Sequence, residues 1–324
     1  MPESEDLLAL LNICEIESSN TPVLFSVLGS PDKFYRSFKI PKRNGGFRVI
    51  DSPYPSLEII QRSILRNVLS NFPAHPNAYA FIKGRNAITH ASHHLACREL
   101  ITLDIKDFFP SITRQMVIDA LIENGLANGV ANYISLLCCL NGTLPQGACT
   151  SPALSNLVFE RIDERLSRLA KTLKLKYSRY ADDLAFSGDA IPRDMPQLIE
   201  RILESRDLKL NKEKIRLKIA GAKKIITGVS ISSGTLKAPR EFKRLLRTQI
   251  YELEKNIDDI SQMRSFDPLV YERVLGRLNY LLQIEPKNAF ALQKKASLSQ
   301  HHQRFLALSS GQWPALFPDA DLAA

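Results

Sequence analysis

Tyr180-Ala181-Asp182-Asp183 is the stretch that decides the fold, because two neighbouring carboxylates stand between two strand-like segments. Alternation of apolar and polar residues leads into it from Leu175, and the apolar run Leu184-Ala185-Phe186 leads out of it. The pattern predicts a hairpin with both aspartates at its tip. Adjacent carboxylates repel each other, and a divalent cation relieves that repulsion because hard metals bind carboxylate oxygens.

A third carboxylate lies upstream, where Asp104 ends an apolar, strand-like run that begins at Ile101. Asp104, Asp182 and Asp183 together could hold two Mg²⁺ ions, the arrangement that drives in-line phosphoryl transfer. The carboxylates therefore predict a metal-dependent nucleotidyl transferase. The alternative is that the four-residue motif is a polar turn that arose by chance.

Composition limits the class of protein. With 324 residues, of which 44% are hydrophobic, the chain can form about two domains or one subdivided enzyme. No apolar run is long enough to span a bilayer, and the acidic start at residues 1–6 is unlike a secretory signal. The five cysteines include no Cys-x-x-Cys pair, which argues against a disulfide framework or a zinc site. We therefore expect a cytoplasmic protein without a membrane partner.

Positive charge is concentrated in one part of the chain. The net charge is +9, while the segment from Lys209 to Arg247 alone holds twelve basic and two acidic residues, a net of +10. Such a run is often only a solvated surface. Because this one directly follows the predicted hairpin, it favours contact with a nucleic-acid backbone.

Periodicity and turn residues give the coarse organisation. Residues 35–50 predict a hairpin around the turn Arg43-Asn44-Gly45-Gly46. Helices are predicted over 114–123 and 130–140, and a long amphipathic helix is predicted to follow Pro152. Four charged residues of that long helix are expected mostly on its outer face: Glu160, Arg161, Asp163 and Glu164. From Pro239 onward the pattern is helical, and the last dozen residues resemble a loosely held tail.

The order of these segments is more specific than any one of them. The Asp104 strand, the loop Leu144-Pro145-Gln146-Gly147, the long helix and Tyr180-Ala181-Asp182-Asp183 follow one another as in the palm of reverse transcriptases, which this succession resembles. The resemblance implies an α+β fold with right-hand polymerase architecture: fingers, a palm of antiparallel sheet plus helices, and a helical thumb. The implied divisions are a helical lead-in (1–34), fingers with an insert (35–100), a palm (101–236, with fingers helices at about 114–145) and a thumb with tail (237–324).

The resemblance also implies roles for individual residues. The carbonyl of Ile105 would be an extra metal ligand, and Lys214 would protonate the pyrophosphate leaving group. Gly147 would let the backbone approach the substrate closely. One ring of Phe108-Phe109 is expected to pack in the core, and Phe109 would exclude ribonucleotides. The residues expected to bind the incoming deoxynucleoside triphosphate are Lys42, Arg48, Phe109, Gln146 and Tyr180.

Two further segments resemble retron reverse transcriptases. Thr227-Gly228, within Lys224-Ile225-Ile226-Thr227-Gly228-Val229, is similar to a Val-Thr-Gly motif associated with recognition of the enzyme's own structured RNA. An Asn-Ala-x-x-His motif matches Asn86–His90 by letter and His90–His94 by spacing; we favour the second frame. The residues that would contact RNA are then Ala91, His94, Thr227, Gly228, Lys237, Arg240, Lys243, Arg244 and Arg247.

This resemblance implies RNA-templated DNA synthesis on a self-encoded noncoding RNA, primed from a 2′-hydroxyl, that yields a branched RNA–DNA product. The biological setting would be antiphage defence with a separate effector protein. Two alternatives stay open: another bacterial reverse transcriptase that uses an unrelated template, and an RNA-binding scaffold whose chemistry is idle. His90, His93 and His94 share a predicted helix face, but a metal site there would need more ligands.

Overall fold

The computed structural model describes residues 4–42, 45–255 and 269–309. Its contacts divide the chain into two compact units, Met1–Ala222 and Lys223–Ala324. The expected boundary between palm and thumb, at 236, lies inside the second unit. Two parts of these predictions lie outside the described residues: Arg43 and Asn44 of the predicted turn, and the last dozen residues, which were predicted to be a tail.

A four-stranded antiparallel sheet forms the centre of the first unit, with strand order β4-β5-β3-β6. The strands are β3 (Glu99–Asp104), β4 (Lys176–Tyr180), β5 (Asp183–Gly188) and β6 (Arg216–Lys218). β4 and β5 form the hairpin predicted from sequence, with Tyr180 paired to Asp183. Because β5 also pairs with β3, Asp183 lies directly opposite Asp104.

Helices supply the rest of this unit's core. The predicted helices are confirmed as α6 (Arg114–Glu123), α7 (Asn128–Cys138) and α8 (Ser151–Thr172). Pro152 fits the first turn of α8, where an amide hydrogen is not needed. Asp163 was expected on the outside of α8 but is fully buried, and the reason is its ion pair with Arg179. The other helices of the unit are α1 (Ser4–Cys14), α2 (Thr21–Gly29), α3 (Pro55–Asn67), α4 (Ala87–His93), α5 (Phe108–Ser111) and α9 (Met195–Glu204).

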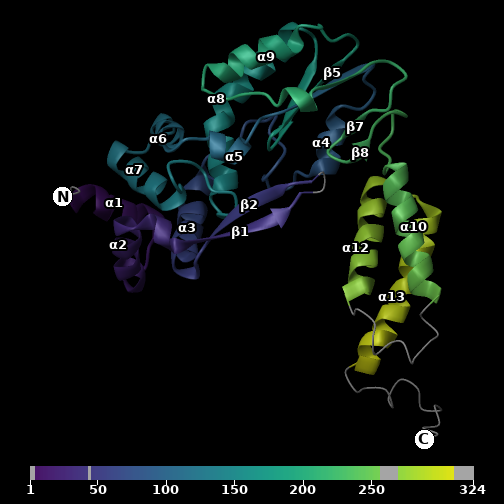
Figure 1. Cartoon of the computed structure of the whole chain (residues 1–324), viewed down its shortest axis with the longest axis horizontal. Helices are drawn as coiled ribbons and strands as arrows, with labels where there is room; N and C mark the ends of the chain where they lie inside the picture. The colour runs from purple at the N-terminus through teal and green to yellow at the C-terminus, as the bar shows by residue number, and fades with distance from the viewer. Residues whose placement is uncertain (1–3, 43–44, 256–268, 310–324) are drawn as a thin grey trace, which may run out of the picture. The chain divides into compact units, whose positions relative to one another are not determined.

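A separate two-stranded hairpin joins β1 (Tyr35–Pro41) to β2 (Phe47–Pro53), as predicted. Most of its residues are exposed, and in Figure 1 it extends as a ribbon beside α3. Its base is held in the core by Tyr35, whose hydroxyl accepts a hydrogen bond from the buried Gln61 of α3 at 2.8 Å. The hairpin therefore has a fixed root and a solvated tip.

The second unit begins with a small hairpin, β7 (Ile225–Ile226) and β8 (Val229–Ser230). The helices that follow in the described part of this unit are α10 (Arg240–Lys255), α12 (Leu269–Ile284) and α13 (Ala289–Ser309). α12 packs against both others, as Figure 1 shows, and each contributes apolar residues such as Leu246, Leu278 and Leu298 to the shared interior. The α+β fold class is thus confirmed. Among the described helices, none has the length and apolar character needed to cross a membrane.

Candidate active site

Three carboxylates converge where β3, β4 and β5 meet. Asp104 is the last residue of β3 and is mostly buried, and Asp183, the first residue of β5, is its register partner. Asp182 lies in the turn before Asp183, and its carbonyl accepts a hydrogen bond from the N–H of Ile105 at 2.9 Å. Asp104 and the Asp182-Asp183 pair, far apart in sequence, therefore lie together at one edge of the sheet.

Burial and repulsion among the three carboxylates raise the pKa values of two of them. Burial, together with the charges of Asp182 and Asp104, raises the pKa of Asp183 to about 7. Burial and the charge of Asp104 likewise raise the pKa of Asp182. Both shifts mean that the protein alone does not fully offset the negative charge gathered here.

Lys214, which the resemblance gave as a proton donor, supplies one compensating charge beside the carboxylates. It lies in the short 3₁₀ helix η4 (Lys212–Lys214), and its Nζ is 2.7 Å from Oδ2 of Asp104. The hydrogen bond to Asp104 raises the pKa of Lys214, so its ammonium form is favoured. A proton donor is therefore held beside the carboxylates.

The donor set suits a hard divalent cation. Carboxylate oxygens and a backbone carbonyl such as that of Ile105 are the ligands Mg²⁺ prefers. Within the described part of the chain, however, no three Asp, Glu, His or Cys side chains are grouped so that they could hold a metal ion as they stand. Lys214 occupies one oxygen of Asp104. The residues present fit the ion in their chemistry, and the other oxygen of Asp104, Oδ1, has no hydrogen bond to Lys214.

The two phenylalanines after Asp104 have different surroundings. Phe108 is buried and packs on Phe159 with ring centroids 5.0 Å apart. Phe109 is half-buried, 5.2 Å from the Phe108 ring and 6.2 Å from the ring of Phe81. The expectation that one ring packs in the core is therefore confirmed for Phe108, and Phe109 keeps a partly open face.

The loop that contains Gln146 is joined to the β1–β2 hairpin. The N–H of Asp51 donates to the carbonyl of Gln146 at 2.9 Å. Gly147 has φ +143°, and a Cβ there would lie 2.7 Å from the carbonyl oxygen of Asp51. The missing Cβ of Gly147 thus lets the loop lie against strand β2, and the expected approach to the substrate stays a prediction. Two proposed nucleotide-binding residues, Lys42 and Arg48, are exposed near the tip of the same hairpin.

Helix α4 explains the two frames of the Asn-Ala-x-x-His motif. Asn86 caps the helix, and its side chain accepts hydrogen bonds from the N–H groups of Ile88 and Thr89, each at 2.9 Å. His90 is buried, and its ring stacks on Tyr180 with centroids 5.5 Å apart. The frame that starts at Asn86, which we did not favour, is therefore the one whose asparagine and histidine both have clear structural roles.

The RNA contacts expected of Ala91 and His94 are wrong, because both residues are fully buried. The two ring nitrogens of His94 lie 2.6 Å from the hydroxyls of Ser187 and Ser178, so His94 joins β5 to β4. Burial lowers the pKa of His94 to about 2. The three histidines of this segment do not form a metal-ligand group among the described residues.

The remaining residues expected to contact RNA lie in the second unit. Thr227 and Gly228 form the turn between β7 and β8, with φ of +43° and +81°. Lys243 is paired with Glu285 at 2.8 Å, and the guanidinium of Arg247 lies 5.2 Å from the ring centroid of Phe290. Both are thus partly engaged within the protein, while three further cations are exposed: Lys237, Arg240 and Arg244.

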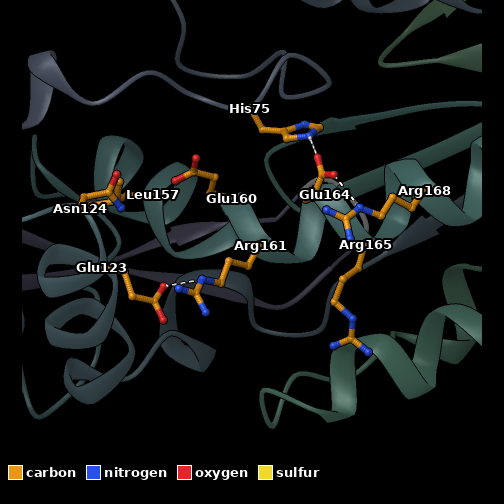
Figure 2. Close-up of a pocket in the computed structure, with 9 residues that line it drawn as sticks. All are labelled: His75, Glu123, Asn124, Leu157, Glu160, Arg161, Glu164, Arg165 and Arg168. Atoms are coloured by element: carbon orange, nitrogen blue, oxygen red, sulfur yellow. Dashed lines mark hydrogen bonds and ion pairs between the residues drawn. The ribbon is translucent and has the colours of Figure 1, made fainter.

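A hollow of about 590 Å³ lies on the outer face of α8 (Figure 2), and its lining contains none of the catalytic, metal-binding, nucleotide-binding or RNA-binding residues predicted from sequence. Its charged groups mostly pair with one another. Arg161 contacts Glu123 at 2.9 Å, and Glu164 contacts both Arg168 at 2.7 Å and His75 at 3.4 Å. This mutual pairing leaves little charge directed at a ligand.

Sequence reasoning missed the buried pair formed by Arg179 and Asp163. Both positions carry a signal that could have indicated it. Arg179 occupies an inward position in the alternation of β4, and Asp163 falls within the apolar face of α8, between Ile162 and Leu166. Because charged side chains are rarely buried unless they are paired, an arginine and an aspartate that both fall at core positions are expected to form an ion pair.

Comparison with known proteins agrees with this geometry. Residues 40–227 match the family described as reverse transcriptase (RNA-dependent DNA polymerase). The chain belongs to that family, and its fold is the right-hand polymerase fold.

Three similar proteins belong to one group within that family, the retron reverse transcriptases. The Mx65 enzyme of Myxococcus xanthus is 33% identical over 81% of this chain and 64% of its own length. The Mx162 enzyme of Myxococcus xanthus is 33% identical over 68% of this chain and 53% of its own length. The Ec83 enzyme of Escherichia coli is 29% identical over 82% of this chain and 88% of its own length. The chain thus spans less than two thirds of the two Myxococcus relatives.

Among solved structures, a telomerase from Candida albicans in complex with a fragment of telomeric RNA aligns with 86% of this chain and 61% of its own, at a TM-score of 0.46 and 11% identity.

Proposed function

We propose that this protein is an RNA-directed DNA polymerase of retron type, which copies a structured noncoding RNA into single-stranded DNA that remains linked to RNA. The observation that carries the polymerase chemistry is the meeting of Asp104 and Asp183 as register partners, with Asp182 in the adjoining turn, and the likeness to retron reverse transcriptases supports the retron type. A polar turn that arose by chance would have no reason to face a third carboxylate from another strand.

Asp104, Asp182, Asp183 and the carbonyl of Ile105 would hold two Mg²⁺ ions. When bound, the ions supply charge stabilisation and a lowered pKa of the attacking hydroxyl. Lys214, already beside Asp104, would be free to protonate the pyrophosphate once a cation replaces it on that carboxylate. While Lys214 is bonded to Asp104, its raised pKa favours the ammonium form that carries this proton.

Substrate binding would use the surfaces around this edge of the sheet. Lys42 and Arg48 on the exposed hairpin would close over the triphosphate of a deoxynucleotide. Gln146 would meet the sugar and template side, and Tyr180 would lie beside the substrate. Phe109, with its partly open face, would exclude a 2′-hydroxyl by steric clash.

RNA recognition would fall to the second unit. The Thr227-Gly228 turn and the exposed cations Lys237, Arg240 and Arg244 would follow the shape and phosphates of an RNA stem. Lys243 and Arg247 would add positive charge to that surface while they keep their contacts with Glu285 and Phe290. In this role the protein would work in antiphage defence with a separate effector protein.

The experiment is to purify the protein from its native host and to label the co-purifying nucleic acid before digestion with DNase or RNase. A discrete DNA species with an RNA remnant that survives as a branch supports the retron assignment. RNA alone, or no discrete species, would favour a reverse transcriptase that uses another template or an idle scaffold. The Asp182→Asn variant is the matched control, because it removes a carboxylate and leaves the basic surface intact.

A further inference from the structure

Arg179 lies in β4 directly before the catalytic turn, and its side chain is fully buried. A guanidinium in the core is costly unless it is paired. Asp163 of α8, also fully buried, provides the pair: Nε is 2.9 Å from Oδ1, and Nη2 is 2.7 Å from Oδ2. This two-point contact fixes the plane of the guanidinium.

Two further contacts hold the same group. Nη2 also donates to the side-chain oxygen of Asn156 at 3.1 Å, and Cζ lies 4.8 Å from the ring centroid of Phe159. Both partners belong to α8. The orientation of Arg179 is therefore set by one helix, and the direction in which its remaining nitrogen points is set with it.

That remaining nitrogen, Nη1, points to the catalytic turn and donates to the carbonyl of Ala181 at 3.3 Å. Ala181 has φ +55°, in the left-handed region that a residue with a Cβ rarely adopts. Such a conformation persists when its surroundings hold it. On the β3 side, the N–H of Ile105 holds the next carbonyl, that of Asp182. Both peptide oxygens of the turn are thus tied to the rest of the protein.

We infer that Arg179 is a positioning residue: α8 fixes its guanidinium through Asp163, and the guanidinium fixes the left-handed Ala181 and hence the aim of Asp182 and Asp183 toward Asp104. This inference rests on the function proposed above and deepens it. It assigns to a buried ion pair, which would otherwise only stabilise the core, the task of orienting the carboxylates that hold the metal ions.

The first test compares Arg179→Lys with a matched control, Tyr177→Phe. Lysine keeps a positive charge near Asp163, but its single ammonium group lacks the planar set of donors with which the guanidinium binds Asp163 and the Ala181 carbonyl together. The Tyr177 hydroxyl donates to Asp163 at 2.7 Å, so its removal perturbs the same buried network from the other side. We expect kcat for deoxynucleotide incorporation to fall about tenfold to a hundredfold in Arg179→Lys, with KM little changed. Tyr177→Phe should keep kcat at the wild-type value.

The second test separates positioning from stability. The double variant Arg179→Met/Asp163→Leu removes both charges, and apolar replacement of a buried ion pair is often neutral for stability. We expect a melting temperature near that of the wild type, a kcat as low as that of Arg179→Lys, and a smaller rise in melting temperature on addition of Mg²⁺ alone. The Mg²⁺ response reports the carboxylates without any need for catalysis.

Full wild-type kcat and a full Mg²⁺ response in either folded Arg179 variant would overturn the inference. If the double variant does not fold, equal kcat values for Arg179→Lys and Tyr177→Phe would overturn it instead. Absence of DNA synthesis by the wild-type protein would count against the proposed function and not against Arg179. The Mg²⁺ response of the same variants would then still decide whether Arg179 orients the carboxylates.

Discussion

Acid should destabilise this protein through His94, whose buried ring joins β4 to β5. Its pKa is about 2 in the folded state, against 6.5 for the free side chain. Because the folded-state value is the lower one, stability is fully present above pH 6.5 and is lost as the pH falls below it. At pH 5, about 1.5 units below the unfolded value, the loss is about 2 kcal/mol. His90, with a pKa of about 3, adds a similar loss of about 2 kcal/mol.

The assay is urea unfolding followed by far-ultraviolet circular dichroism at pH 7.5 and pH 5.0. His94→Gln cannot titrate, and its amide can still bond both serine hydroxyls. The wild type should lose about 2 kcal/mol more than this variant between the two pH values. In thermal melts a difference of about 2 kcal/mol corresponds to a shift of about 4 to 8 °C in the melting temperature of the first unit.

A control variant, His301→Gln, removes a histidine from α13 and should leave the pH dependence of the first unit unchanged. Equal pH dependence in wild type and His94→Gln would refute the reasoning, because it would mean that His94 is already protonated in the fold or that its burial costs nothing.

Three further outcomes follow from the active site and the RNA surface. Asp182→Asn should abolish DNA synthesis and leave RNA binding nearly intact, as measured by primer extension and filter binding; parallel loss of both, with the fold preserved, would contradict this division of roles. Gly147→Ala places a Cβ against the Asp51 carbonyl and should cost about 1 to 3 kcal/mol in stability, seen as a lower urea midpoint; an unchanged midpoint would show that the contact yields without cost. Replacement of Thr227-Gly228 by Ala-Ala should reduce discrimination between cognate and unrelated structured RNA in competition binding, and unchanged discrimination would remove this turn from the RNA surface.

Local pattern was enough to predict the elements that carry the carboxylates. The β4–β5 hairpin follows from the alternation before the aspartates and the apolar run after them, and α8 follows from Pro152 and a continuous apolar face. These signals lie within a few residues of one another, so no knowledge of distant contacts is needed. The pairing of Asp104 with Asp183 required more, namely the order of segments along the chain.

The errors arose where a distant partner decides the environment. Asp163 was expected at the surface because a carboxylate in a helix usually faces water, but Arg179 of β4 provides a buried partner for it. His94 was assigned to RNA from motif spacing, which carries no information on burial. Gly147 was expected to let the backbone approach the substrate, and only the folded chain shows that its missing Cβ makes room for the carbonyl of Asp51.

The division of the chain at Ala222 places the proposed catalytic residues and the proposed RNA-binding residues in separate parts of the gene. Every carboxylate of the catalytic centre, with Lys214, is encoded before that point, and the turn and cations proposed to read RNA are encoded after it. On the proposed roles, joining residues 1–222 to the second unit of a relative would keep Asp104, Asp182, Asp183 and Lys214 and would replace the surface proposed to read RNA. The preference for a template RNA would then be exchanged as one continuous segment of the gene.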